Sequence, residues 1–157
     1  MIQFSFSYDK NKTIQALRYH FFSRKEIKVM IVVVNVFAIV AAVLFYSKMI
    51  RPEPFLLGSF IWVTLMLSIW YILPYSIYRK SSTFKEKFNI TIGSIDVKID
   101  NEQGRIAWPW AAFTKYFESP HFFHLYFDEK SFFLIPKDSM TEEMKHDFRG
   151  VLKEMIG

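Results

Sequence analysis

Two uninterrupted apolar runs dominate the first half of the chain. Residues 29–46 carry no charged side chain, and residues 55–78 form a second, longer run of the same kind. About 20 helical residues cross a hydrocarbon core of roughly 30 Å, so each run predicts a membrane-spanning helix. The short connection between them contains Pro52 and Pro54, which indicates a turn between antiparallel helices. The pattern therefore predicts a transmembrane helical hairpin over residues 29–78.

Two other interpretations of these apolar runs fit the sequence less well. Two buried core helices of a soluble protein would also be apolar, although such helices are seldom this uniform. A cleaved signal peptide places a short basic segment before its apolar core. Here 28 residues precede the first run and FYSKMI follows it, so we expect Met1 to remain attached.

Positive charge is concentrated in the apolar half of the chain. Residues 1–80 carry 10 Lys and Arg against 3 acidic residues, whereas residues 81–157 carry 10 against 12. This placement fits anionic lipid headgroups and argues against a nucleic-acid partner. The connection between the runs holds only Lys48 and Arg51, so the positive-inside rule predicts a cytoplasmic location for both termini. The basic residues expected on that side are Arg18, Arg24, Lys25, Lys28, Arg79, Lys80, Lys85 and Lys87.

Polar and small residues within the runs predict how the two helices pack. Ala38 and Ala42 have the small-xxx-small spacing that lets helix backbones approach closely. Asn35 is expected to hydrogen-bond across to Ser68 or to a second copy, with a role in a functional pathway as the less favoured alternative. Pro74 is expected to kink or end the second helix.

After Arg79 the period of the apolar residues changes to two, which is typical of half-buried antiparallel strands. Turn residues separate the strands, including Gly93-Ser94 and Ser119-Pro120. The predicted strands are FKEKFNITI, IDVKID, RIAWPW, TKYFES, FFHLYF and SFFLIP. A capping box from Ser139 to Glu142 then predicts one amphipathic C-terminal helix that closes the sheet. Its apolar stripe comprises Met140, Met144, Phe148, Val151, Leu152, Met155 and Ile156.

The N-terminal segment MIQFSFSY alternates in the same way but has no strand near it in the sequence. Since a lone strand is unstable in water, we expect it to join the C-terminal sheet and to raise the strand count from six to seven. A disordered or interfacial tail is the alternative. Residues 13–22 predict a short helix with Arg18 snorkelling. The residues expected to face the bilayer are Ile14, Leu17, Phe21 and Phe22.

Six or seven antiparallel strands followed by one helix describe a pleckstrin-homology-like barrel. The aromatic pattern around these strands also resembles that of the YcxB-like family, small bacterial membrane proteins with two transmembrane helices and a C-terminal domain related to bacterial pleckstrin-homology domains. The pattern consists of a strand ending in Trp110, the turn AAF, the segment KYFES, the pair Phe122-Phe123 and FFLIPKDSM. The resemblance implies a fold and a membrane location, and no catalytic residues.

Two tryptophans flank a proline in this pattern. We interpret Trp110 as a core residue that fixes the turn between the third and fourth predicted strands, with Trp108 beside it; ligand stacking is the less favoured alternative. Pro109 removes a strand donor and so indicates an edge strand or a bulge. The expected domain core signature is Trp108, Trp110, Phe113, Phe133 and Ile135.

The sequence contains none of the patterns that carry common chemistry. It has no cysteine, and it lacks nucleotide-binding, nucleophile-elbow and zinc-protease motifs. His121 and His124 are three residues apart, which places them on opposite faces of a strand, so we expect no metal site. No cofactor is expected, and an enzyme is the minority interpretation.

We therefore expect an α+β membrane protein in three parts: residues 1–28 with a strand and a juxtamembrane helix, residues 29–78 with the hairpin, and residues 79–157 with a cytoplasmic domain. The expected role is a multi-pass adapter of the bacterial inner membrane that binds a protein partner or a second copy. Its exposed sheet edge, or the hairpin FFHLYF–SFFLIP, would add a strand. A lipid-facing collar would consist of Arg79, Lys80, Lys85 and Lys87. A small transmembrane subunit of a transporter or stress-response complex is the alternative.

Overall fold

A computed structural model describes residues 1–157, which form two compact units. One unit is helical and comprises residues 17–80. The other combines residues 1–16 with residues 81–157, so that the helical unit is inserted into it. The first helix, α1 (Lys10–Ser23), runs across the boundary.

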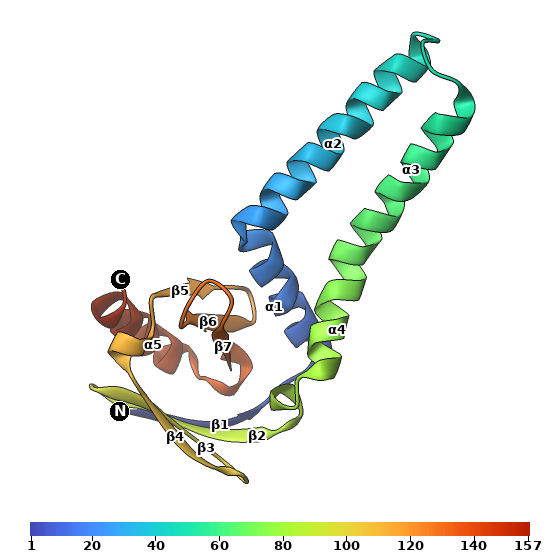
Figure 1. The fold of residues 1–157 in the computed structure, drawn as a ribbon. Helices are drawn as coiled ribbons and strands as arrows, with labels where there is room; N and C mark the ends of the chain where they lie inside the picture. The colour runs from blue at the N-terminus through green and yellow to red at the C-terminus, as the bar shows by residue number, and fades with distance from the viewer. The chain divides into compact units, whose positions relative to one another are not determined.

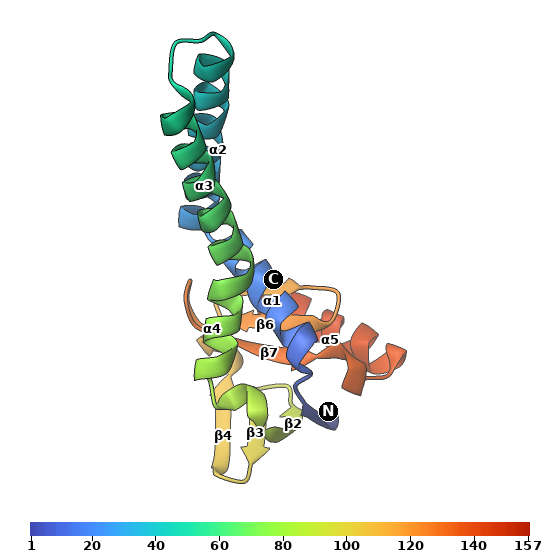
Figure 2. The same cartoon turned by 90° about the vertical axis from the view of Figure 1, so that its right-hand side faces the viewer.

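The helical unit is a hairpin of long apolar helices (Figures 1 and 2). Helix α2 (Lys25–Tyr46) and helix α3 (Pro52–Leu67) run antiparallel, and near the tip the rings of Phe45 and Phe55 stack with their centroids 4.4 Å apart. Lys25–Tyr46 and Pro52–Lys80 are each long and apolar enough to cross a membrane. Within their apolar stretches only 0% and 6% of the residues are buried, so neither is a core helix of this chain.

The second long helix does not end at Pro74. A π-helical turn (Ser68–Ile72) follows α3, and helix α4 (Leu73–Lys80) continues beyond it with Pro74 in its first turn. Proline lacks a backbone N–H and crowds the carbonyl four residues earlier, and a wider turn is one way for a helix to relieve this conflict. The helix is therefore distorted close to Pro74, as predicted. The distortion is the π-helical turn that precedes the proline.

The N-terminal strand joins a four-stranded antiparallel sheet, as its alternating pattern predicted. The strand order is β1-β2-β3-β4, with β1 Ile2–Ser7, β2 Lys87–Ile92, β3 Asp96–Asn101 and β4 Gly104–Pro109. β1 pairs with β2 along its whole length, so that Phe6 lies opposite Phe88 and Ser7 opposite Lys87. The helical unit thus connects two neighbouring strands.

The remaining strands form a second antiparallel sheet, so the expected closed barrel is wrong. Its order is β5-β6-β7, with β5 Lys115–Glu118, β6 Phe122–Tyr126 and β7 Phe132–Pro136. The chain leaves the first sheet at Pro109, enters a 3₁₀ turn (Trp110–Ala112) and begins β5 without pairing it to β4. The break falls directly after the proline that cannot donate a ladder hydrogen bond.

Side chains of the two sheets and the C-terminal helix form one aromatic core. Helix α5 (Glu142–Met155) inserts Phe148 and Leu152, both fully buried, and the ring of Phe148 meets Phe123 edge-on at 4.9 Å. The N-cap of the helix lies two residues later than the predicted one. Thr141 is its N-cap and accepts from the backbone N–H of Met144, whereas Ser139 lies in a preceding 3₁₀ turn.

Four residues of α1 were predicted to face lipid, and for two of them the prediction is wrong. Leu17 and Phe21 are 0% and 6% exposed, so they are packed inside the protein instead of facing lipid. Ile14 and Phe22 are half-buried. Periodicity places apolar residues on one face of a helix, but it does not distinguish lipid from protein as the surface that covers that face.

Candidate functional site: an open sheet edge and its supports

Strand β4 is one of the two edge strands of the four-stranded sheet. It follows β3 at the end of the strand order and has no neighbour on its other side. Its residues are exposed except for the half-buried Trp108, and the side chain of Ile106 is 54% exposed. Ile95, in the turn before β3, is 80% exposed. An edge strand with exposed apolar side chains is a template for pairing with another chain.

The direction of the backbone groups on β4 follows from one hydrogen bond. The N–H of Trp110 donates to the carbonyl of Ile95 at 3.3 Å, so this N–H points toward β3. Along an antiparallel strand the groups alternate in direction. The N–H and C=O groups of Arg105 and Ala107 therefore point outward, and Pro109 removes the third outward donor. The edge offers a short, defined set of partners for an added strand.

A network of side chains fixes the turn from β3 to β4. Asn101 accepts through Oδ1 from the N–H groups of Gln103 and Gly104, at 3.0 and 2.9 Å. The carboxylate of Glu86 accepts from the side-chain amides of Asn101 and Gln103, at 2.7 and 2.8 Å. Gly104 has a φ of 153°, which residues with a side chain rarely adopt. The edge strand is thus held in one conformation before any partner binds.

The other end of β4 is anchored by the two tryptophans. Trp110 is 5% exposed and donates its indole N–H to the carbonyl of Gly93 at 3.1 Å. Trp108 packs edge-on against Phe133 at 5.2 Å and against Phe113 at 6.2 Å. Phe133 and Ile135 lie on β7 and are buried. The structure brings all five residues of the predicted core signature into the same core.

The hairpin of β6 and β7, which was the other predicted strand-addition surface, is not available through its side chains. Every residue of β6 is buried, as is every residue of β7 except the half-buried Phe132. Tyr8 donates its hydroxyl to the carbonyl of Leu134 on β7 at 2.7 Å, and burial raises the pKa of this phenol. The aromatic residues that mark this hairpin in the sequence serve the core, whereas β4 is an edge strand with exposed side chains, and we take it as the candidate site.

A cluster of charges joins β5 to the C-terminal helix. Arg149 donates to both carboxylate oxygens of Glu118, through Nη2 at 2.7 Å and Nε at 3.1 Å. Lys137 pairs with the same carboxylate at 2.5 Å. Both cations lie over the ring of Phe123. The Arg149 hydrogen bonds, with those of Lys137, lower the pKa of Glu118 to about 2. The cluster fastens α5 to the second sheet.

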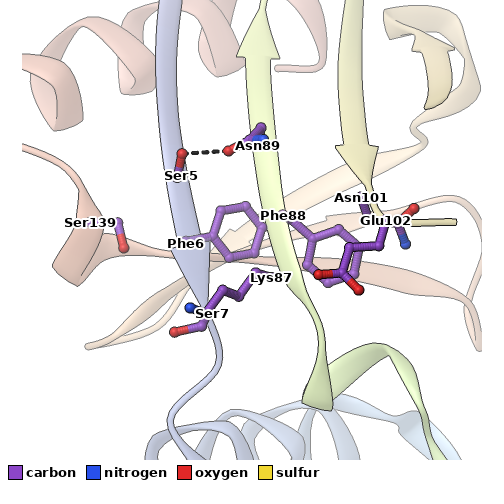
Figure 3. Close-up of a pocket in the computed structure, with 9 residues that line it drawn as sticks. All are labelled: Ser5, Phe6, Ser7, Lys87, Phe88, Asn89, Asn101, Glu102 and Ser139. Carbon is purple, nitrogen blue, oxygen red and sulfur yellow. Dashed lines mark hydrogen bonds between the residues drawn. The ribbon is translucent and has the colours of Figure 1, made fainter. Parts of the chain in front are cut away.

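A polar hollow of ≈ 650 Å³ lies on β1 and β2 (Figure 3). The stacked rings of Phe6 and Phe88 and the hydrogen bond from Ser5 to Asn89 form part of its wall. Its remaining lining residues are Ser7, Lys87, Asn101, Glu102 and Ser139. The hollow brings together no group of three or more metal-ligating side chains.

Two of the predicted helix-packing residues lie where the hairpin helices meet, and the other two make hydrogen bonds within their own helices. Ala38 and Ala42 line a groove of ≈ 640 Å³ between α2 and α3 together with Gly58 and Ser59. Asn35 donates to the carbonyl of Ile31 at 2.7 Å, in its own helix. Ser68 likewise donates to the carbonyl of Thr64 at 2.8 Å. Asn35 and Ser68 thus donate within their own helices and not to each other, and a hydrogen bond from Asn35 to a second copy stays a prediction.

The four collar residues are exposed and form two pairs. Arg79 and Lys80 end helix α4, and Lys85 and Lys87 flank Glu86 just before and at the start of β2. The sequence did not predict two features that bear on function. One is the outward direction of the backbone groups of Arg105 and Ala107, and the other is the hydrogen bond from Arg18 to the carbonyl of Trp70. Only the proline at position 109 signalled the first of them.

These features define an α+β protein in which a hairpin of two long apolar helices is inserted between the first two strands of a two-sheet domain. A family model described as YcxB-like protein matches residues 93–152, from the turn before β3 through most of α5. The match confirms the resemblance and identifies this C-terminal segment as YcxB-like. No curated protein and no solved structure matches the chain.

Replacing Glu118 with Gln should lower the melting temperature at pH 7. The ion pairs are partly exposed, with 30% exposure of the Glu118 side chain, so solvent screening limits their contribution to about 1 kcal/mol, or roughly 2–4 °C. The pKa of Glu118 is lower in the folded protein than in the unfolded chain, where it is 4.5. The carboxylate therefore stabilises the fold at pH values above 4.5, and this contribution is lost as the pH falls toward about 2. The difference between the two proteins should therefore shrink across that range.

Thermal melts of the full chain in mild detergent at pH 7, 4 and 2.5 measure this effect. Glu129→Gln, in the exposed turn between β6 and β7, is the matched control and should leave the melting temperature unchanged at each pH. A deficit of the Glu118 variant that is as large at pH 2.5 as at pH 7 would contradict the electrostatic account.

Proposed function

We propose that this protein is a membrane-anchored interaction module that binds an extended protein segment along strand β4. The observation that carries the proposal is the unpaired edge of β4, which has outward backbone groups at Arg105 and Ala107 and the half-exposed Ile106 between them. Main-chain hydrogen bonds would supply affinity, and the exposed side chains would supply specificity. The occupant is a strand from a protein partner or from a second copy.

The two-sheet unit supports a pleckstrin-homology-like assignment. Its four-plus-three arrangement of antiparallel strands, followed by one C-terminal helix, fits that fold, with the helical hairpin inserted after the first strand. The assignment accords with the YcxB-like match and concerns the fold alone, because interaction domains of this kind serve many partners. It therefore supports the adapter role and brings no chemistry with it.

The hairpin is proposed to cross the bacterial inner membrane twice, with both termini in the cytoplasm. Two arguments support this topology. Ser7 and Lys87 are paired residues, so the chain enters and leaves the helical unit at one place, which requires an even number of crossings. The collar residues Arg79, Lys80, Lys85 and Lys87 add positive charge on that side, where anionic lipid would attract it.

Cysteine labelling tests the topology, because the chain has no native cysteine. A membrane-impermeant maleimide should label Ser47→Cys, at the hairpin tip, in spheroplasts. It should label Ser94→Cys, in the exposed turn between β2 and β3, only after permeabilisation. Replacing the four collar residues with Gln should increase the fraction of molecules that insert with the opposite topology. Labelling of Ser94→Cys in intact spheroplasts, or failure of the protein to sediment with membranes, would contradict the proposal.

Ala107→Pro tests the partner-binding edge. The substitution removes one outward N–H and leaves the hydrogen bonds between β3 and β4 in place, whereas Ala107→Ser keeps the N–H. In tagged protein purified from its own membranes in mild detergent, co-purifying proteins are quantified by mass spectrometry. A stoichiometric partner should fall by about tenfold or more with Ala107→Pro and should persist with Ala107→Ser.

Persistence of the partner with Ala107→Pro would contradict binding at the edge.

The second candidate function, a small transmembrane subunit of a transporter or stress-response complex, is favoured by the groove of small residues on α2 and α3. Gly58 lines this groove, and a Cβ there meets nothing within 4 Å, so Gly58→Leu places a bulky side chain at the groove. A partner lost with Gly58→Leu and retained with Ala107→Pro would establish the helices as the working surface.

A further inference from the structure

An arginine satisfies the helix carbonyl that Pro74 leaves without its usual donor. In a regular helix the N–H of residue 74 would bond to the carbonyl of residue 70, but proline has no N–H. The Nε–H of Arg18 donates to the carbonyl of Trp70 at 2.9 Å. A residue of α1 thus fastens the π-helical turn (Ser68–Ile72), and π-helical turns are frequent at functional sites.

Aromatic rings hold the same guanidinium from the side. Its central carbon lies 5.3 Å from the ring centroid of Trp70 and 5.3 Å from that of Tyr71. The ring of Phe22 packs against Trp70 at 5.2 Å, which restricts the indole in turn. Cation–π contacts orient a guanidinium without using its N–H groups. The bond to Trp70 uses Nε alone, so it leaves the four N–H donors of the two Nη atoms to other partners.

The level of this arginine in the hairpin follows from the register of the helices. Phe45 stacks on Phe55, and in an antiparallel pair this contact sets Trp70 near the level of Met30, just after Lys25 and Lys28 at the start of α2. Trp70, Tyr71 and Tyr75 are 45%, 54% and 45% exposed. Exposed Trp and Tyr side chains beside the last basic residues are typical of the boundary between hydrocarbon and headgroups.

We propose that Arg18, held by Trp70 and Tyr71, binds the phosphate of a phospholipid headgroup. The inference rests on the proposed membrane-spanning role of the hairpin and adds to it a specific lipid site. Two Nη–H donors of a fixed guanidinium match two phosphate oxygens, and the neighbouring Trp and Tyr rings accept the glycerol and the upper acyl chain. The ligand is the lipid phosphodiester, because the acyl chains lie on the same exposed aromatic and apolar surface.

Native mass spectrometry of the full chain in mild detergent tests the site. The protein is titrated with phosphatidylglycerol and, separately, with a diacylglycerol of the same acyl chains that lacks the phosphate. The unmodified protein should bind phosphatidylglycerol at least about tenfold more tightly than diacylglycerol. Arg18→Gln should remove most of this difference, and Arg18→Lys, which keeps the charge but loses the fork of donors, should retain part of it.

Controls separate loss of the site from loss of the fold. Arg51→Gln, at the opposite end of the hairpin, should keep the full preference for phosphatidylglycerol. Tyr71→Leu removes one ring but keeps the bond to Trp70, so it should weaken phosphatidylglycerol binding about threefold in a protein with an unchanged melting temperature. Saturating inorganic phosphate should not displace the lipid, and displacement would assign the site to free phosphate.

Two results would overturn the proposal in different ways. If Arg18→Gln and Tyr71→Leu bind phosphatidylglycerol and diacylglycerol as the unmodified protein does, the lipid site is wrong while the membrane hairpin stands. If the unmodified protein is extracted from membranes by alkaline carbonate, the hairpin does not span the bilayer, and the proposed function fails together with the site that depends on it.

Discussion

The architecture depends on the pairing of the first strand with a strand that follows both long helices. β1 and β2 pair from Ile2 with Ile92 to Ser7 with Lys87, and the rings of Phe6 and Phe88 stack across this pair with centroids 5.6 Å apart. The pairing makes residues 1–16 part of the two-sheet domain, although the helical unit separates them from the rest of it in the sequence. A fragment that begins after the hairpin would lack the edge strand that covers β2.

The same constraint links the fold to the proposed function. β1 and β4 are the two edge strands of the sheet, and β4 carries the exposed apolar side chain of Ile106 and is reached through the turn that Asn101 and Gly104 fix. Edges of this kind are usually protected in soluble proteins. Here Pro109 and the Arg105–Asp100 ion pair limit the exposed length without closing it. In the proposed role, tethering to a membrane would raise the local concentration of membrane-bound partners and so offset the short length of this edge.

The sequence predicted the elements well and their contacts less well. The alternation in MIQFSFSY predicted a strand that needs a distant partner, because polar and apolar positions on a strand imply two different faces. Pro109 predicted an edge strand or a bulge, because a missing donor is tolerated at few other positions in a sheet, and β4 is an edge strand. The division into two sheets was not predicted, since β4 and β5 are individually as regular as the other strands, and only their lack of pairing separates the sheets.

The sequence did not predict contacts in which one group has several possible partners. Asn35 was expected to bond across the hairpin, but the carbonyl of Ile31 in its own helix satisfies it first. Both Ser139 and Thr141 precede an acceptable helix start, and the choice between them depends on the preceding 3₁₀ turn. The donor for Trp70 comes from Arg18, far away in the sequence, and no local pattern marks that pair.

Disulfide trapping of β1 against β2 tests the central claim most directly. Gln3 and Thr91 are directly opposed, at a separation that suits a disulfide between cysteines at these positions. Oxidation of the Gln3→Cys, Thr91→Cys double variant in native membranes, followed by non-reducing electrophoresis and peptide mapping, reports whether the two strands meet and whether they belong to one chain. The account predicts a cross-linked monomer. A cross-linked dimer would mean that the strand is exchanged between copies, and the absence of any cross-link would mean that the N-terminal strand does not belong to the sheet.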